Sequence, residues 1–367
     1  MIKKFITNKL NFFLFLPKLF FPIRFLNTNN SKIRPYFGVN IFKTGGPYIR
    51  IRRLIKIFGN NFFNPNIIYA QSYWTSEELK DAINFSKKYN IPIIFNQNGW
   101  FYKGWYGKGW KDKNKQLINA HKQSKLVIYQ SKFCKDTSIK LNSYFAKNNK
   151  IIHNCVPLKY KTFKNIKKNY FLLSGVFDQN SEHILNPALD AFINLSEDYD
   201  YKEYNLKLII AGYFTKGAKY SKWYKKINEK IKILLSKELI EIRGKYLNKN
   251  FEEEFKDINF ALHLKYKDPC PNAVLERMSL GIIHVFSDSG GTPELIGNAG
   301  LGISVKDRWS NQISVNHIIL VKKIFQAIKK KKILKKNVKK KIDDFSYKKY
   351  IKLHKAIFVN ALKNDKK

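Results

Sequence analysis

Two carboxylates, Asp268 and Glu276, stand eight positions apart in this chain. Asp268 lies in a loop whose backbone is stiffened by Pro269 and Pro271, and Glu276 lies one turn into a helix predicted over residues 272–280. Carboxylates accept hydrogen bonds from hydroxyl groups, and the free N–H groups at a helix start bind anions. The pair therefore predicts a site for a ligand that carries both sugar hydroxyls and phosphates.

A glycine pair follows the carboxylates. Gly290 and Gly291 come after an apolar run at residues 282–286, and the sequence Thr292-Pro293-Glu294 then opens another predicted helix. Paired glycines let a backbone approach a ligand closely. Alone, an acidic pair is usually solvated surface and a glycine pair is usually a turn. Because both occur in this order on these elements, we interpret them as one functional site.

Apolar runs alternate with helical patterns along the chain, which predicts parallel sheets covered by helices. The predicted strands cover residues 36–41, 66–70, 91–95, 126–130, 151–152, 170–174, 206–211, 240–243, 260–264, 282–286 and 302–305. Pro47 and Gly59 bracket a predicted helix at 48–58, and another is predicted at 75–89. A polar, lysine-rich stretch at residues 157–169 separates two such series and is predicted to be a linker. We therefore expect two doubly wound α/β domains that face each other across a cleft, where ligands bind beyond the strand ends.

The composition gives weaker guidance. The 367 residues carry a net charge of +42, which either reflects an anionic partner or the lysine enrichment of AT-rich codons; dispersed lysines favour the second interpretation. The three cysteines are scattered and no histidine pair has ligand spacing, so we expect no metal site and no disulfide framework. No nucleic-acid-binding motif appears.

Two segments could contact a membrane, and we expect no transmembrane helix. Residues 11–26, within an N-terminal segment at 1–30, combine phenylalanines with basic residues and fit an interfacial segment as well as an ordinary packed one. The lysine run at 329–341 fits a basic amphipathic helix, but a solvated outer helix face is favoured.

The residues around Asp268 resemble the retaining glycosyltransferases of family 4, whose hallmark is an E-x7-E motif followed by a glycine pair and Pro-Glu. Asp268 stands at the first glutamate position in a variant Asp-Pro-Cys-Pro-Asn form, and Glu276 at the second. The resemblance covers nearly the whole chain and is strongest over residues 258–305. It implies the GT-B fold, which consists of two Rossmann-like doubly wound domains facing across a cleft.

The first half fits the same family in order. Thr44-Gly45-Gly46-Pro47 follows the first predicted strand, where members carry a glycine pair near the donor phosphates. Asn98 stands where members often carry a histidine. The Arg and Lys that usually clamp the donor diphosphate are missing from residues 173–187. The candidate replacements are Lys265, Lys267 and, if protonated, His183.

The resemblance implies transfer of a hexosyl group from a nucleotide-sugar donor to a glycan or lipid-linked acceptor, with retention and without a metal or cofactor. Residues 1–156 would be the acceptor-side domain, 170–344 the donor-binding domain, and 345–367 a helix crossing back to the first domain. Asp268 would hold the transferred sugar, Glu276 the ribose, and Asn98 would complete the catalytic set. The donor-binding residues would be Gly45, Gly46, Asn272, Ala273, Gly290, Gly291, Thr292 and Glu294.

Aromatic residues after Asn98 predict an acceptor platform of Trp100, Tyr102 and Trp105, with simple packing as an equal alternative. We expect a cytoplasmic protein, peripheral at the inner membrane face if its basic segments bind anionic lipid, acting in cell-surface polysaccharide or lipopolysaccharide synthesis. The alternatives are a non-catalytic sugar-nucleotide or glycan-binding protein of the same fold and, on charge alone, a nucleic-acid-binding protein.

Overall fold

The computed structural model describes residues 33–38, 45–156, 160–161, 168–198, 201–246 and 251–363. The N-terminal segment at 1–30, Thr44 and most of the predicted linker lie outside these ranges. The chain forms two compact units. The first unit comprises Met1–Trp100, Lys111–His153 and Lys348–Lys367, and the second comprises Phe101–Trp110 and Asn154–Tyr347.

The first unit is built on a five-stranded parallel sheet in the order β1-β2-β3-β4-β5. Its strands are β1 (Pro35–Tyr36), β2 (Ile67–Gln71), β3 (Ile93–Gln97), β4 (Leu126–Tyr129) and β5 (Asn149–Ile151). Strands β2 and β3 are buried along their whole length, as expected of a parallel sheet covered on both faces.

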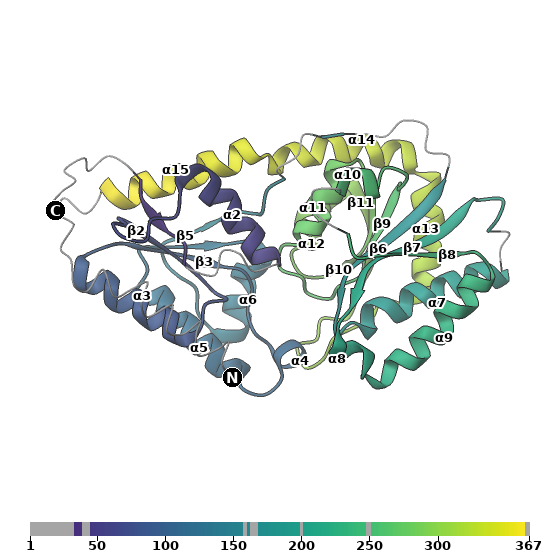
Figure 1. Cartoon of the computed structure of the whole chain (residues 1–367), viewed down its shortest axis with the longest axis horizontal. Coiled ribbons are helices and arrows are strands. Elements are labelled where there is room, and N and C mark those ends of the chain that lie inside the picture. The colour runs from purple at the N-terminus through teal and green to yellow at the C-terminus, as the bar shows by residue number, and fades with distance from the viewer. Residues whose placement is uncertain are drawn as a thin grey trace. The chain divides into compact units, whose positions relative to one another are not determined.

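Helices cover both faces of this sheet (Figure 1): α2 (Gly46–Phe58) and α15 (Tyr347–Lys363) lie side by side, and α3 (Ser76–Tyr89) and α5 (Trp110–Lys122) lie on the opposite face. The remaining helix is α6 (Lys132–Asn142). Thr75 caps α3 through a capping box with Glu78, which fixes the start of that helix.

The C-terminal helix α15 is held in the first unit by buried polar contacts. Arg50 donates from Nε to the Tyr350 hydroxyl at 3.0 Å, and the Tyr69 hydroxyl lies 3.0 Å from His354 Nε2. The rings of Phe58 and Phe358 also meet edge to face, with centroids 5.0 Å apart. These contacts join α15 to α2 and β2, although some 280 to 300 positions separate them in sequence.

The second unit is built on a six-stranded parallel sheet in the order β11-β10-β9-β6-β7-β8. Its strands are β6 (Asn169–Phe177), β7 (Leu206–Phe214), β8 (Ile240–Gly244), β9 (Phe260–His263), β10 (Ile283–Asp288) and β11 (Gly300–Ser304). The chain runs outward from β6 through β8 and then returns to β9 on the other side of β6. The strand order therefore reverses between β6 and β9, which is the point where open α/β sheets bind ligands.

The helices of the second unit are α4 (Lys103–Tyr106), α7 (Glu182–Asp198), α8 (Lys216–Lys219), α9 (Lys222–Ser236), α10 (Phe251–Glu254), α11 (Asn272–Ser279), α12 (Thr292–Ile296), α13 (His317–Lys329) and α14 (Lys331–Ile342), with short 3-10 turns at Gly297–Ala299 and Asp343–Phe345. Helix α7 contacts both α9 and α13, and α14 contacts α11. The core includes the stacked rings of Phe171 and Phe260, 4.6 Å apart on adjacent strands.

The predicted fold class is confirmed: both units are α/β with parallel sheets. Each of the eleven predicted strands overlaps an observed one, with ends shifted by a few residues. The lysine run differs from the prediction of one continuous helix. Ile324 lies on α13, whereas Leu334 and Val338 lie on α14, and the two helices are separated at Lys330.

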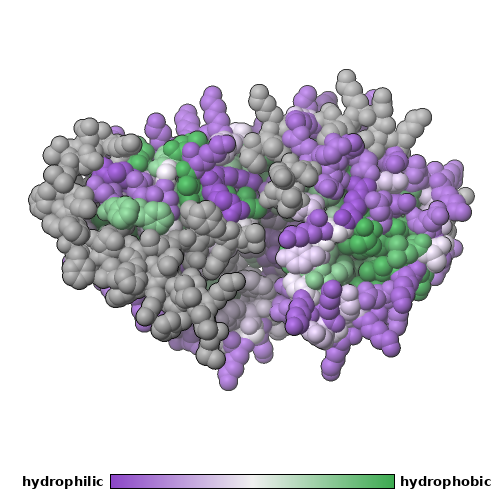
Figure 2. Space-filling view, viewed as in Figure 1, coloured by the Kyte–Doolittle hydropathy of each residue, from purple (hydrophilic) through white to green (hydrophobic). Residues whose placement is uncertain are grey.

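Helix α14 turns Leu334, Val338 and Ile342 inward, which leaves most of its lysines at the surface. Hydrophilic side chains project along the edge of the second unit where α14 lies (Figures 1 and 2). The apolar side of the lysine run is therefore used for packing within this unit.

Candidate active site

The loop that carries Asp268 begins at the carboxyl end of β9, beside the reversal point of the sheet. The ladder between β6 and β9 ends at the pair Leu172 and Ala261, so the two strands are no longer bonded beyond it. The loop is fixed from the side by Asn154, whose side-chain amide donates to the Cys270 carbonyl at 2.7 Å. Asp268 is thus held at the place where a ligand is expected.

The glycine pair Gly290 and Gly291 contacts the backbone of this loop at Asp268. The Gly291 N–H donates to the Asp268 carbonyl at 2.8 Å. Gly290 has a φ of +72°, and a Cβ there would lie 2.4 Å from the same carbonyl oxygen. The close approach that paired glycines allow is therefore made to the Asp268 loop itself, and the Gly291 N–H is already used there.

Asp268 lies between a lysine and a histidine. Its Oδ2 is 3.1 Å from Lys265 Nζ and 3.8 Å from His263 Nε2. Burial alone would raise the pKa of Asp268. The Lys265 ammonium, the interaction with His263 when that ring is protonated, and hydrogen bonds from Lys265 and the Cys270 backbone together outweigh burial, so the pKa lies below its ordinary value. The Asp268 carboxylate also raises the pKa of Lys265, and burial lowers the pKa of His263 to about 4. At neutral pH the trio is a carboxylate, an ammonium and a neutral imidazole.

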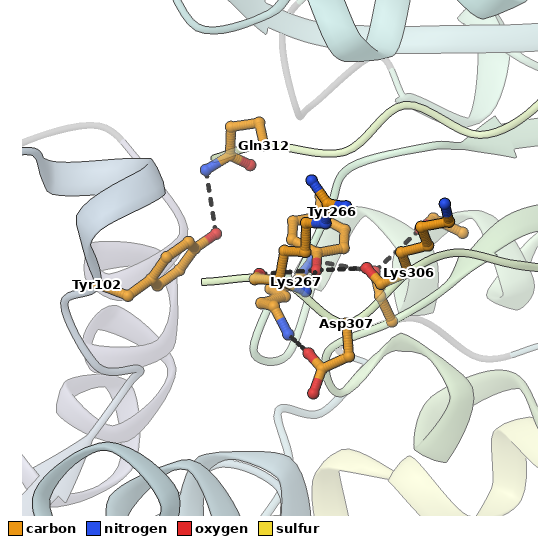
Figure 3. Close-up of polar contacts among 9 residues, drawn as sticks. Tyr102, Tyr266, Lys267, Lys306, Asp307 and Gln312 are labelled. Carbon is orange, nitrogen blue, oxygen red and sulfur yellow. Dashed lines mark hydrogen bonds and ion pairs between the residues drawn. The ribbon is translucent and has the colours of Figure 1, made fainter. Parts of the chain in front are cut away.

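Lys267, one of the predicted phosphate cations, is paired with a carboxylate of its own unit. Its Nζ forms an ion pair with Asp307 (Figure 3). The same Nζ lies 3.7 Å from the centre of the Trp309 ring. The side chain is almost fully buried, and its backbone has a φ of 51°. The charge of Lys267 is therefore already compensated by a carboxylate and an aromatic face.

His183 is held in its neutral form. Its Nδ1 lies 2.7 Å from the Asn180 carbonyl, and its Nε2 accepts the Tyr266 N–H at 3.4 Å. Burial lowers its pKa to about 4. The protonation that would make His183 a phosphate cation is thus disfavoured, which leaves Lys265 as the sequence-predicted cation whose charge adjoins Asp268.

Arg277 is a buried cation of this region that is not among the predicted site residues. It follows Glu276 in α11 and is 1% exposed, and its Nη2 contacts both the carbonyl, at 3.2 Å, and the hydroxyl of Ser174. Ser174 lies on β6, at the start of the stretch that lacks the expected diphosphate clamp. Arg277 Nε has no hydrogen-bond partner in the described part of the chain. Burial lowers the pKa of Arg277, against the opposing effects of Tyr246 and the Glu276 carboxylate. The signal that could have found it is an arginine at an inward position of the motif helix.

Two helix starts stand beside the loop. Asn272 and Ala273 form the first turn of α11, whose N-cap, Pro271, gives it no side-chain cap. Thr292 begins α12 and is fully buried, and its hydroxyl has no hydrogen-bond partner among the described residues. Glu276 and Glu294 are partly buried one turn or less from these starts. The second unit therefore gathers eight of the predicted residues around one loop: Asp268, Glu276, Asn272, Ala273, Gly290, Gly291, Thr292 and Glu294.

The first unit carries the other predicted residues. Asn98 follows β3, and its Oδ1 accepts hydrogen bonds from Asn96 and Gln130, at the carboxyl ends of β3 and β4. Its backbone N–H donates to Ser72 Oγ at 3.0 Å. The Asn98 side-chain Nδ2 is buried and has no hydrogen-bond partner in the ranges that the structure describes.

Gly45 and Gly46 begin α2 in the same unit. Gly45 has a φ of +120° and is the N-cap of a 13-residue helix with no side-chain cap and no acidic residue in its first turn. Such a helix start presents backbone donors and favours an anion.

The predicted aromatic platform is only partly exposed. Trp100 is buried in the first unit, where its indole donates to the Cys134 carbonyl at 2.9 Å. Tyr102 is buried in the second unit, and Trp105 is 49% exposed. Trp100 and Tyr102 therefore serve packing, and only Trp105 of the three offers a ring face to solvent.

Across the described ranges, no group of three or more His, Cys, Asp or Glu side chains could hold a metal ion. None of the described helices is long and apolar enough to cross a bilayer.

A family model described as glycosyl transferases group 1 matches residues 158–342, which is half of the chain and includes the whole Asp268 region. The chain belongs to this family. The region that matches the group 1 glycosyl transferase model lies within the second unit. Comparison with curated protein sequences gives no match.

Several solved structures share the fold of this group 1 glycosyl transferase. HepE of Anabaena in complex with UDP has a TM-score of 0.63 at 14% identity, covering 80% of this chain and 78% of that one. Sucrose-phosphate synthase of Thermosynechococcus elongatus has a TM-score of 0.62 at 13% identity, with 86% and 78% covered. The lipopolysaccharide outer core galactosyltransferase WaaB has a TM-score of 0.53 at 16% identity, with 81% and 76% covered. The fold is thus the GT-B fold that the sequence predicts.

Proposed function

We propose that this chain moves a hexosyl group from a nucleotide-sugar donor to a glycan or lipid-linked acceptor, with retention and without a metal ion. The observation that carries the proposal is the position of Asp268. This ionised carboxylate stands at the reversal point of the second sheet, 3.1 Å from an ammonium and next to a helix start. Such a site suits a sugar with its hydroxyls on one side and phosphates on the other.

In this proposal the groups have separate tasks. Asp268 accepts hydrogen bonds from the hydroxyls of the transferred sugar, and Glu276 accepts those of the ribose. Lys265 and Arg277 provide the positive charge that the leaving diphosphate needs, together with the N–H groups of α11. The diphosphate then takes the proton of the acceptor hydroxyl as the new glycosidic bond forms on the same face of the sugar.

Relatives suggest the biological setting. HepE has been crystallised with UDP, and WaaB is an outer core galactosyltransferase of lipopolysaccharide. We propose a uridine nucleotide sugar as the first donor to test and cell-surface polysaccharide or lipopolysaccharide as the product. Attachment to the inner face of the cytoplasmic membrane through basic segments is part of the same proposal.

Carboxylate variants test the proposal directly. Asp268→Ala and Glu276→Ala should each abolish transfer from a radiolabelled nucleotide sugar while the melting temperature is kept. Glu253→Ala is the matched control, since this carboxylate of the same unit is 75% exposed and pairs with the surface residue Lys256. Full turnover by either site variant would sink the assignment.

One observation favours a second function, a sugar-nucleotide-binding protein without turnover. Of the three cations predicted to replace the diphosphate clamp, Lys267 is paired with Asp307 and His183 is neutral. A site short of positive charge would bind a donor but release diphosphate slowly. Thermal stabilisation by nucleotide sugars together with neither transfer nor donor hydrolysis would establish this alternative.

A further inference from the structure

The segment Phe101–Trp110 belongs to the second unit, although the chain on both sides of it belongs to the first. The Gly104 N–H donates to the Trp309 carbonyl at 2.8 Å. The Gln312 side-chain amide donates to the Tyr102 hydroxyl at 3.1 Å (Figure 3). It also donates to the Gly104 carbonyl at 3.1 Å. The rings of Tyr102 and Trp309 meet edge to face with centroids 5.2 Å apart. The segment is thus anchored on residues 309–312.

Gly104 makes this anchoring tight. A Cβ built on Gly104 would lie 2.4 Å from the backbone nitrogen of Asn311 and 2.6 Å from its Cα. Because backbone atoms cannot move aside as a flexible side chain can, only glycine fits here without displacing the segment. A larger residue at position 104 would therefore shift the segment 101–110 away from Asn311.

The anchor is continuous with the Asp268 loop. The Tyr266 hydroxyl lies 2.8 Å from the carbonyls of Lys306 and Arg308 and accepts the Arg308 N–H at 2.7 Å. Lys267 binds Asp307 from the next position (Figure 3). Asp268 follows in sequence, so the loop that holds the segment is fastened to the residues immediately before the site carboxylate.

The outer side of the segment is aromatic and exposed. Trp105 is 49% exposed and Tyr106 is 42% exposed. The rings of Phe101 and Trp105 are parallel to within 8° at 5.4 Å, and Tyr106 meets Phe101 edge to face at 4.8 Å. Exposed Lys103 and Lys108 lie on the same segment. Exposed aromatic rings that contact one another beside hydrogen-bond donors form a surface that suits a ligand with both an apolar face and hydroxyl groups.

We propose that Phe101, Trp105 and Tyr106 form a platform that binds the apolar C–H face of a sugar ring in the acceptor glycan. The inference rests on the proposed function, because a glycosyl acceptor is the saccharide that must lie near Asp268. Tyr102 and Gly104 are positioning residues that fix the platform to the donor-binding unit. The lysines of the segment donate hydrogen bonds to the ring hydroxyls.

Titration with lactose, maltose and chitobiose, followed by tryptophan fluorescence and calorimetry, tests the platform. At least one disaccharide should bind saturably, and Trp105→Ala should weaken that binding by about tenfold or more. Gly104→Ala should weaken it as well with Trp105 intact. Tyr220→Ala is the matched control, because Tyr220 is a 79% exposed aromatic residue of the same unit, and it should bind like the wild type.

Three outcomes would overturn the platform. The first is no saturable binding of any of the three sugars, and the second is equal binding by Trp105→Ala and the wild type. The third is a wild-type dimer that Trp105→Ala dissociates, because a second copy of the chain would then cover the aromatic surface. Thermal stabilisation by UDP-glucose is measured in parallel. It should be equal in Trp105→Ala and wild type. If UDP-glucose stabilises neither protein and neither transfers sugar, the proposed function is contradicted. The platform is then tested by the disaccharide titrations alone.

Discussion

Lys265 Nζ lies 3.1 Å from the Asp268 carboxylate, and the two side chains differ in exposure, at 52% for the lysine and 13% for the aspartate. The carboxylate is therefore shielded from water on most sides while its counter-ion can still reach a ligand. Because the Asp268 carboxylate is largely buried, its interaction with Lys265 is screened less than an ion pair between two exposed side chains, and Lys265 lowers the pKa of Asp268. The same ammonium is free to turn toward a diphosphate when a sugar hydroxyl occupies Asp268.

Replacing Lys265 by methionine should change both rate and pH dependence. Loss of the ammonium removes the charge that lowers the pKa of Asp268, so that pKa should rise, and the acid limb of the kcat/KM profile should move to higher pH. The rate at neutral pH should fall on the order of 100-fold. Lys256→Met is the control, since Lys256 pairs with the exposed Glu253 in the same unit. If the acid limb does not move, Lys265 does not influence the pKa of the catalytic carboxylate.

Arg277→Met should lower donor affinity without unfolding the protein. The guanidinium is buried and burial disfavours its charge, so its removal relieves a desolvation cost and should leave the melting temperature unchanged or raised. The Kd for a UDP-sugar should rise by about tenfold or more, because a cation beside Ser174 is lost. Calorimetric titration measures the affinity. An unchanged Kd with a lower melting temperature would make Arg277 a structural residue.

Lys267→Met should act through position rather than charge. The side chain fastens the start of the site loop to Asp307 and Trp309, so its loss should lower kcat more than it raises the donor KM. We expect a destabilisation of about 1–2 kcal/mol from the lost cation–π contact. Asp307→Asn keeps the cation–π contact but leaves the buried ammonium without its carboxylate, so its free energy of unfolding should fall at least as much as that of Lys267→Met. A clearly smaller loss in Asp307→Asn would show that the cation–π contact alone fastens the loop.

The sequence predicts the scaffold of this protein better than the side-chain environment of the site. Strand periodicity locates all eleven observed strands, because buried parallel strands are continuous apolar runs. The Asp268 loop and α11 are predicted from local signals, two prolines and a helix start, and the structure places them at the reversal point.

What the sequence could not predict depends on distant partners. Lys267 and Lys265 are equivalent lysines in sequence, but Asp307 and Trp309, some 40 positions away, occupy one of them. Trp100 and Trp105 are likewise similar in sequence, yet one is buried against Cys134 and the other is exposed. Whether a charged or aromatic side chain is available to a ligand is decided by tertiary contacts that no local pattern records.

Acidification should destabilise the first unit through His354. The Tyr350 carbonyl lies 2.9 Å from its Nδ1 and the Tyr69 hydroxyl 3.0 Å from its Nε2, so the neutral ring is satisfied, and burial lowers its pKa to about 3. An unfolded histidine titrates near about 6.5. Between these values the unfolded state binds more protons, so the stability present above pH 6.5 is lost as the pH falls. The free energy of unfolding should drop by up to about 1.4 kcal/mol per pH unit from this group. His354→Gln retains a donor and an acceptor but cannot titrate, and its urea midpoint should fall less steeply between pH 7 and pH 4.5. Parallel pH dependence in wild type and variant would exclude His354 as the group responsible.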